Sequence, residues 1–408
     1  MSTFGGAGGA GGAGVFGGAG GAGLLGGAGG AGGAGGAGGA GGAGGAGGAG
    51  GAGGAASAAN PLVAGALITH RDGIVGSWKG RDFAGPQRLF DDPDQLELWE
   101  YWVRATLLDF ELQSNVQFCV DSGASVPRWA GLWHMRKTTL GTGTTAPRST
   151  GSAIAQITRP DDAVTFIADQ LDLVNGYADL REDRAAEILA QLTPPVAFWC
   201  SVLPLHPTRH RWTMELLDVA MRFANSIEMR FKHALAFRRP GEYSAQIQPM
   251  ILTPGHSSYP SGHSTEAHMA ALILRRLVNN LYPNQSWGDQ LMRQAHRIAV
   301  NRTIAGMHFP VDSAAGHALG LTLAEYFIQR CSATVSNNFQ PWKFDGTQYF
   351  SKDDFDPTRH FNFGTSKQQQ AKSSNGATIF ADKIGGTTTV RKSRILGWLW
   401  AKAYKEWT

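Results

Sequence analysis

The first part of the chain lacks charge. No Asp, Glu, Lys or Arg precedes Arg71, and residues 5–55 are almost wholly Gly and Ala, without proline. Collagen needs Gly at every third position together with many prolines, so this tract is not collagen-like. It buries little surface and loses much backbone entropy on ordering. We therefore predict that residues 1–59 are a disordered tail and that residues 60–408 form a single domain.

Cysteines and long apolar runs are also scarce. The three cysteines, Cys119, Cys200 and Cys331, are far apart and form no CxxC pair, which argues against a disulfide framework or a zinc ribbon. No uncharged apolar run approaches the ~20 residues that span a bilayer. The N-terminus lacks a basic stretch followed by an apolar one, as an ordinary signal peptide has. We expect a soluble protein without a membrane span, and the compartment stays open.

Dense runs of Lys and Arg are absent as well. The net charge is only +4, and this mild excess does not indicate a nucleic-acid partner. What the chain does have, beyond the tail, is apolar periodicity of about 3.6 residues. It predicts a mainly α fold, a helical bundle, with helices over residues 96–107, 164–174, 216–227, 264–281, 287–300, 311–329 and 395–402.

Strand patterns are few in this sequence. Only Thr378-Ile379 and Thr387–Val390 are modest candidates, and the chain is polar and irregular from Asn337 to about Lys392. We expect an irregular C-terminal extension over residues 337–408. Its last part, residues 395–402, has the pattern of a short amphipathic helix that docks on the core.

Three segments carry groups suited to an anion. In the first, Lys232 and Arg239 stand seven residues apart, about two helical turns, and Pro240 follows. This spacing places both cations on one face of a helix that Pro240 ends. Taken alone, the pair is equally consistent with a solvated basic surface.

The second segment is a turn-rich loop that leads into a helix. Ser261, Gly262 and His263 lie where the apolar period begins. Unpaired N–H groups at a helix start suit an anion. Ser261 adds a hydroxyl donor, Gly262 permits close approach of the backbone, and His263 can exchange a proton near neutral pH. An ordinary helix cap would have the same residues.

The third segment runs from Asn301 to Asp312. Arg302 offers a planar fork for a tetrahedral oxyanion. His308 comes just before a helix, and Asp312, four residues on, is placed to accept one imidazole N–H and leave the other nitrogen free. A lone His beside an Asp is more often a structural pair. The hypothesis of an anion site therefore depends on the three segments taken together.

The combined pattern resembles a known signature. Lys-x6-Arg-Pro, Pro-Ser-Gly-His and Arg-x5-His-x3-Asp follow in this order within residues 232–312. This is similar to the superfamily that joins vanadium-dependent haloperoxidases, type-2 phosphatidic acid phosphatases and bacterial acid phosphatases. One departure is Asn301, where the third motif usually begins with Ser. The resemblance implies a helical bundle with its oxyanion-site core in residues 213–330.

The haloperoxidase reading of this resemblance takes vanadate as cofactor. It implies that His308 binds vanadium and that His263 is the acid–base. The vanadate oxygens would be bound by Lys232, Arg239, Ser261, Gly262 and Arg302. Lys232 would also polarise hydrogen peroxide, which oxidises a halide to hypohalous acid that halogenates small organic substrates. His256, five residues before Ser261, stands where bromide-oxidising members of the family have histidine, so this reading favours bromide, and iodide too.

Two alternatives remain open. In a phosphatase, His308 would attack phosphorus and His263 would protonate the leaving group. Because we find neither spanning helices nor an export signal, the sequence favours the haloperoxidase over the phosphatase. A non-catalytic anion-binding or scaffold protein is the third possibility, and it draws on the Gly-Ala tract. A homo-oligomer is compatible with each.

Overall fold

The structure is a computed structural model that describes much of the chain after the Gly-Ala tract. The described residues are 61–80, 89–121, 128–135, 151–193, 195–278, 286–331, 338–356, 373–374 and 379–408. The predicted disordered tail, residues 1–59, lies outside them. The described residues divide into two compact units, one within residues 61–107 and one within residues 108–408. We describe each unit by itself.

The described part of the first unit is helical. It contains α4 (Pro61–Ile74), the 3-10 helix η3 (Pro93–Leu98) and the start of α5 (Tyr101–Gln113). The helix expected over residues 96–107 is therefore split. The Asp92 side chain caps η3, Pro93 occupies its first turn, and Trp99 is extended, so the α-helix begins only at Tyr101.

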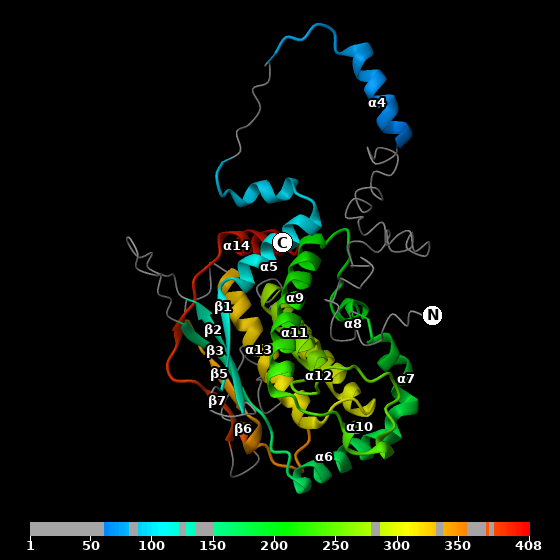
Figure 1. Cartoon of the computed structure of the whole chain (residues 1–408), viewed down its shortest axis with the longest axis vertical. Helices are drawn as coiled ribbons and strands as arrows, with labels where there is room; N and C mark the ends of the chain where they lie inside the picture. Colours follow the sequence, from blue (N-terminus) through cyan, green and yellow to red (C-terminus); the bar gives the residue numbers. More distant parts are fainter. Residues whose placement is uncertain are drawn as a thin grey trace. The chain divides into compact units, whose positions relative to one another are not determined.

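Four long helices form the core of the second unit. Figure 1 shows α11 (Gly262–Val278) among α9 (Arg211–Leu235), α12 (Ser286–Ile304) and α13 (Pro310–Cys331). They confirm the helices that apolar periodicity predicted, although residues 279–281 lie outside the described residues. Two glycines let α13 approach α11, because a Cβ on Gly316 or Gly320 would lie 2.5 Å or 2.3 Å from a backbone oxygen of Ser261 or Thr265.

Shorter elements surround this core. They are α6 (Val164–Tyr177), η4 (Ala178–Leu180), α7 (Arg181–Ala190), α8 (Val196–Cys200), α10 (Pro240–Tyr243), η5 (Ala245–Ile247), η6 (Gly346–Gln348) and α14 (Arg394–Lys405). α14 packs against α9 as expected, and it begins with the Ser393 side chain as cap. Glu406, just after α14, accepts hydrogen bonds from the backbone N–H groups of Trp212 and Thr213, which fixes the start of α9.

A six-stranded sheet lies beside the helices (Figure 1), and the sequence did not predict it. The strands are β1 (Val116–Val120), β2 (Trp129–Met135), β3 (Gly151–Thr158), β5 (Trp342–Asp345), β7 (Ile379–Lys383) and β6 (Ser373–Ser374), in that order. β3 and β5 are parallel and the other neighbours antiparallel. A separate pair joins β4 (Asn338–Phe339) to β8 (Thr388–Thr389).

The missed sheet corrects the expectation of an irregular segment after Asn337. β5 contributes buried Trp342 and Phe344, and it packs against α13 together with β3. In β2, three successive residues, Ala130 to Leu132, are buried. A strand covered on both faces loses the apolar–polar alternation by which strands are recognised. The two segments expected to be strands do contribute to strands. Ile379 begins β7, and β8 lies within Thr387–Val390, while Thr378 is outside the described residues.

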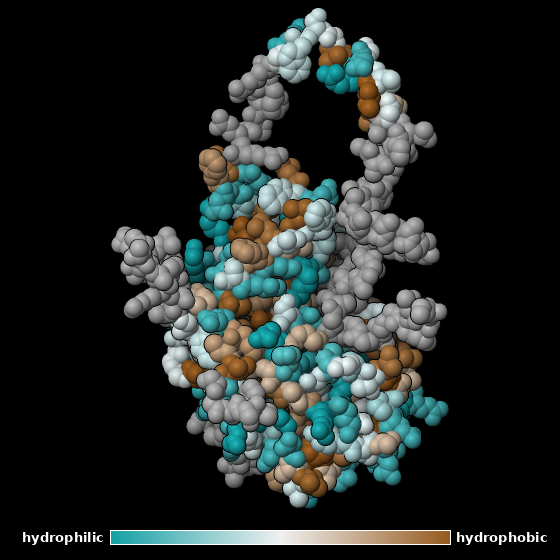
Figure 2. Space-filling view, in the orientation of Figure 1, coloured by the Kyte–Doolittle hydropathy of each residue, from teal (hydrophilic) through white to brown (hydrophobic). Residues whose placement is uncertain are grey.

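The described surface is mixed in polarity. On the face drawn in Figure 2, apolar and polar residues alternate in small patches. Among the helices that the structure describes, none combines the length and the apolar character that crossing a bilayer requires.

Candidate active site

Lys232 and Arg239 reach one pocket from different elements. Lys232 lies in the last turn of α9, which ends because Ala236 adopts a left-handed conformation with φ of 46°. Arg239 follows as the N-cap of α10, with Pro240 in its first turn. The prediction of one shared helix face is therefore wrong, because the turn at Ala236 ends the helix before Arg239. Both side chains are nevertheless buried and line the same hollow.

Lys232 ties the motif loop to α9. Its Nζ donates to the backbone oxygens of Ser257, Ser258 and Pro260 at 3.2, 2.8 and 2.6 Å. Burial, and then the charge of Arg239, lowers the pKa of Lys232 to about 7. An anion bound in the pocket would stabilise the ammonium form of Lys232.

The start of α11 presents Gly262 and His263 to the pocket. His263 Nε2 lies 3.0 Å from the carbonyl oxygen of Gln191, so this nitrogen carries a proton and donates it. Burial, and then Arg302, lowers the pKa of His263 to about 3. The ring is therefore neutral at pH 7 before a ligand arrives.

Ser261 is placed differently from the expectation. It is fully buried but is not among the residues that line the hollow. Its Oγ accepts from the backbone N–H of Ser264 at 3.5 Å, a weak capping contact at the start of α11. The hydroxyl hydrogen stays available as a donor, so the predicted contact to an oxyanion stays a prediction.

Arg302 is a deeply buried cation of the pocket. It is 1 % exposed, and its Nη2 donates to the Ile188 carbonyl at 3.2 Å and to Gln191 Oε1 at 3.0 Å. Its Nε and Nη1 are buried, and within the described part of the chain they have no hydrogen-bond partner. Burial lowers its pKa to about 10, which leaves it charged at neutral pH. Two unpartnered donors on a buried cation are suited to binding an anion.

Asn301, the departure from the family pattern, supports Arg302 indirectly. Its Nδ2 donates to Gln191 Oε1 and to Glu187 Oε1, both at 3.0 Å. Gln191 Oε1 also accepts from Arg302. Sequence reasoning missed Gln191 because it lies on the turn after α7, more than a hundred residues from Arg302. The Asn thus orients the acceptor that holds the guanidinium.

His308 is fixed by two neighbours. Its Nδ1 lies 3.1 Å from Asp312 Oδ2, as predicted, and 3.0 Å from Ser258 Oγ, which was not predicted. Ser258 Oγ also donates to Asp312 Oδ2 at 2.5 Å. Because these groups occupy Nδ1, the nitrogen left for chemistry is Nε2. Burial, then Arg239 and Lys232, holds the pKa of His308 well below its usual range.

The turn before His308 requires glycine. Gly306 has φ of +77°, and a Cβ there would lie 2.8 Å from Arg181 Nη2 and 3.0 Å from Ile247 Cγ2. Met307 then donates its N–H to the Arg302 carbonyl at 2.9 Å. This tight turn brings Arg302, from the last turn of α12, and His308 to the same hollow.

His256 contacts Arg239 at the pocket wall. Arg239 Nε donates to the His256 carbonyl at 3.0 Å, and Nη2 lies 3.2 Å from His256 Nδ1. His256 Nε2 is buried and has no hydrogen-bond partner among the described residues. Burial, then Lys232 and Arg239, lowers the pKa of His256 to about 4. The loop position predicted from the motif is thus part of the site.

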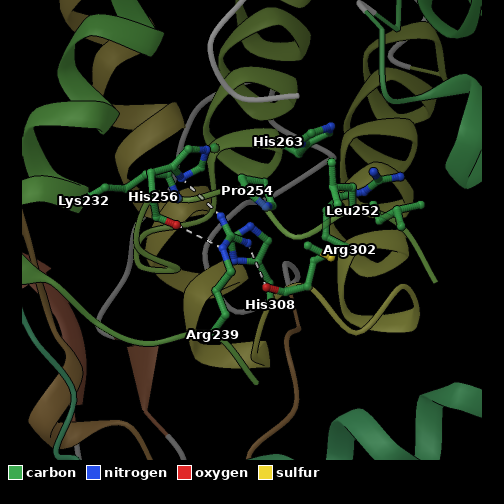
Figure 3. Close-up of a pocket in the computed structure, with 11 residues that line it drawn as sticks. Lys232, Arg239, Leu252, Pro254, His256, His263, Arg302 and His308 are labelled. Atoms are coloured by element: carbon green, nitrogen blue, oxygen red, sulfur yellow. Dashed lines mark hydrogen bonds between the residues drawn. The ribbon is translucent and has the colours of Figure 1, made fainter. Parts of the chain in front are cut away.

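The pocket unites nearly all the predicted residues. Figure 3 shows Arg239 and His308 in the middle of the view, with Lys232 and His256 on one side and His263 and Arg302 on the other. The hollow encloses about 380 Å³, part of it open to solvent. Sequence reasoning missed its apolar lining, formed by Ile251, Leu252, Pro254 and Met307. No group of three or more His, Cys, Asp or Glu suited to a metal ion occurs in the described part of the chain.

The electrostatics favour a bound anion. Lys232, Arg239 and Arg302 are each at most 2 % exposed. Asp312 is fully buried and interacts with the first two, while Glu228 and Glu266 also interact with Lys232. Burial of several cations without matching anions is costly, and an anion among them offsets the cost. Burial raises the pKa of Asp312 to about 6, although bonds from Ser258 and Phe309 act the other way.

Comparison with known proteins agrees with this geometry. Residues 216–334 match the PAP2 superfamily. This segment is a PAP2 superfamily domain. It contains the three motif segments and every residue predicted for the site, so the superfamily resemblance is confirmed. The haloperoxidase branch within it is not shown by the match.

A relative of the PAP2 domain is a phosphatase by name. The chain is 29% identical over 100 residues to the decaprenylphosphoryl-5-phosphoribose phosphatase of Mycobacterium tuberculosis, from two strains. The alignment covers 24% of this chain and 51% of the relative. The chain thus spans about half the length of the curated relatives it matches.

Proposed function

We propose that this chain is a phosphatase-type hydrolase that cleaves phosphate esters in the PAP2-domain pocket. The observation that carries the proposal is the buried guanidinium of Arg302, whose Nε and Nη1 have no hydrogen-bond partner among the described residues, on a residue that lines the same pocket as Lys232 and Arg239. A tetrahedral phosphoryl group satisfies such donors. The phosphatase relative supports this reaction over the haloperoxidase that the sequence favoured.

His308 is the nucleophile in this proposal. Hydrogen bonds at Nδ1 fix the tautomer whose Nε2 lone pair is free, and Asp312 stabilises the positive charge that develops on the ring. Attack of Nε2 on phosphorus forms the P–N bond as the P–O bond to the alcohol breaks. The three cations stabilise the charge on the equatorial oxygens, which is the main contribution a protein makes to phosphoryl transfer.

His263 moves the proton. Burial, and then the charge of Arg302, lowers the pKa of His263, and a phosphate dianion beside the ring acts against both, so binding of the ester favours the protonated ring. It then protonates the leaving alkoxide. In the second half, neutral His263 removes a proton from water, which attacks phosphorus, breaks the P–N bond and releases orthophosphate.

A chromogenic phosphate ester tests this proposal. The wild-type protein should release the alcohol, and orthophosphate should inhibit competitively. His308→Ala should lose the turnover but still bind orthophosphate. Hydrolysis that continues unchanged in His308→Ala would exclude the mechanism.

A second candidate is the vanadate-dependent haloperoxidase, favoured by one observation. His256 stands at the bromoperoxidase-like position, beside Arg239, with its buried Nε2 unpartnered in the described structure. Vanadate has the charge and shape of phosphate, so the orphaned donors of Arg302 fit it equally. His308 would bind it through Nε2, and the other motif residues would hold its oxygens. When bound, vanadate supplies a Lewis acid that activates peroxide.

The second candidate has its own assay. The protein is incubated with orthovanadate, hydrogen peroxide and bromide, and bromination of a phenol dye is followed. Vanadate-dependent bromination without ester hydrolysis would replace the phosphatase by the haloperoxidase. Hydrolysis without bromination would remove the second candidate.

A further inference from the structure

Two carboxyl groups lie behind the pocket wall, and the reaction proposed above uses neither. Glu228 is fully buried on α9, one turn before Lys232. Glu266 is on α11, one turn after Gly262. Residues four apart share one face of a helix, so each carboxyl stands next to a group of the oxyanion site.

Glu228 presses against the backbone of the motif glycine. A Cβ on Gly262 would lie 2.5 Å from Oε1 of Glu228 and 3.3 Å from Oε2. Both oxygens are buried, and no hydrogen-bond partner for them exists among the described residues. An ionised carboxylate in this position would have no donor to stabilise its charge.

Glu266 is a second carboxyl group that interacts with Glu228. Its side chain accepts a hydrogen bond from Asn225, while its Oε1 is buried without a partner in the described chain. Two carboxyls that interact in a buried site cannot both ionise readily, so a proton stays with the pair.

The pKa values of Glu228 and Glu266 also favour the protonated form of each carboxyl group. Burial raises the pKa of Glu228 to about 8, and burial, then Glu228, raises the pKa of Glu266 well above its usual range. Lys232 acts in the opposite direction on both but does not outweigh burial. Lys232 itself is also acted on by Arg239 and Asp312. Both shifts favour the protonated forms, in which the pair adds no repulsion to an anion at Gly262.

We propose that Glu228 and Glu266 hold protons behind the PAP2 pocket and thereby set the pH range over which it binds a tetrahedral dianion. When the pair ionises, negative charge develops against Gly262, and the oxyanion is bound less tightly. Both are positioning residues, because they act through Gly262 and Lys232 and contact no reacting atom. The inference rests on the oxyanion binding of the proposed function.

Sulfate binding, measured by calorimetry, tests the pair. Sulfate is a tetrahedral dianion whose charge is constant between about pH 6 and about pH 9, so only the protein titrates. In the wild type, affinity should fall over this range because both the carboxyl pair and Lys232 titrate, and one charge near the anion changes its binding by about tenfold. Glu228→Gln, which mimics the protonated side chain, should keep the neutral-pH affinity and make the fall about tenfold smaller than in the wild type, leaving the part that Lys232 causes.

The control is Glu325→Gln, which removes a carboxylate of α13 that pairs with Arg276. It should follow the wild-type pH profile. A Glu228→Gln profile identical to the wild type would overturn the proposal. So would a loss of affinity that begins at lower pH than in the wild type, because Glu228 would then act as an ionised partner of Lys232.

The wild-type protein alone provides an independent test. Infrared spectra at neutral pH should contain the carbonyl stretch of a protonated carboxylic acid, and it should disappear as the pH rises. Glu266→Gln should weaken the same band, which covers the case that Glu228→Gln does not fold. Absence of this band would show that neither Glu228 nor Glu266 holds a proton at neutral pH, and it would overturn the proposal. If sulfate and phosphate fail to bind the wild type at every pH, the oxyanion site itself is wrong, and this result differs from an unaltered pH profile.

Discussion

Ser258 Oγ donates a hydrogen bond to Asp312 Oδ2 and lies 3.0 Å from His308 Nδ1. This relationship joins the second and third motif segments, because Ser258 precedes the Pro-Ser-Gly-His run and Asp312 ends the last motif. The carboxylate thus receives the serine hydroxyl and the Phe309 N–H as well as the imidazole. His308, the proposed nucleophile, is held by a network that joins the loop before α11 to the start of α13.

We predict that Asp312→Asn greatly slows ester hydrolysis. The amide can donate to Nδ1 and stabilise the tautomer in which Nε2 carries the proton, so kcat should fall by about 10²–10⁴-fold, as for other base-orienting carboxylates. Ser258→Ala removes one hydrogen bond and keeps the carboxylate, so its loss should be nearer tenfold. Steady-state kinetics measure both, and equal effects would argue against a tautomer role for Asp312.

Arg302→Lys should weaken orthophosphate binding by at least about tenfold, because lysine cannot supply the two fork donors that Arg302 leaves unpartnered. Arg293→Lys, an exposed position on the same helix α12, is the matched control and should bind as the wild type does. Calorimetric titration with orthophosphate distinguishes the two. Retained affinity in Arg302→Lys would show that the fork does not hold the anion.

The stability of the protein should fall in acid because of its buried histidines. The pKa of His263 is lowered from 6.5 to about 3 in the folded chain. Between these values the unfolded chain binds a proton that the folded chain does not, so the free energy of unfolding decreases as pH falls. The slope is at most about 1.4 kcal/mol per pH unit for each such histidine.

Thermal or urea unfolding between about pH 7 and about pH 4 measures this slope. His263→Gln should unfold with a shallower pH dependence than the wild type, by the share of one histidine. An unchanged slope in His263→Gln would mean that His263 is not held neutral in the folded state.

His256→Phe separates the two candidate reactions. In a phosphatase, the substitution should alter ester turnover modestly, since His256 contacts Arg239 and takes no proton in the mechanism. In a haloperoxidase it should change the preference between bromide and iodide. Halide competition in the vanadate assay, beside ester hydrolysis, measures both, and an unchanged halide ratio would remove the role inferred from the sequence position.

Much of the site was predictable because its groups are local in sequence. The order of Lys232, Ser261 to His263, and Arg302 to His308 identified the superfamily, and apolar periodicity located α9, α11, α12 and α13. The path by which Arg239 reaches the pocket was not predictable, since it depends on the left-handed turn at Ala236. Gln191 and Ser258 carry no motif of their own, and only the tertiary fold brings them to Arg302 and His308.

The sheet was missed for a different reason. β2 is buried on both faces and β5 has only four residues, so neither displays a period that the sequence alone reveals. The reaction was also beyond local reasoning, because phosphate and vanadate present the same charge and shape to the same donors. The preference for the haloperoxidase rested on the absence of spanning segments and on His256.

The most direct test of the account is to trap phosphate on His308. The enzyme is quenched during turnover of a phosphate ester labelled at phosphorus, and the acid-labile, base-stable label is located by peptide mapping. We predict phosphohistidine at His308 in the wild type, more of it in His263→Ala, and none in His308→Ala. Ester hydrolysis without label at His308, or label on another residue, would contradict the central claim that His308 bonds to the bound oxyanion.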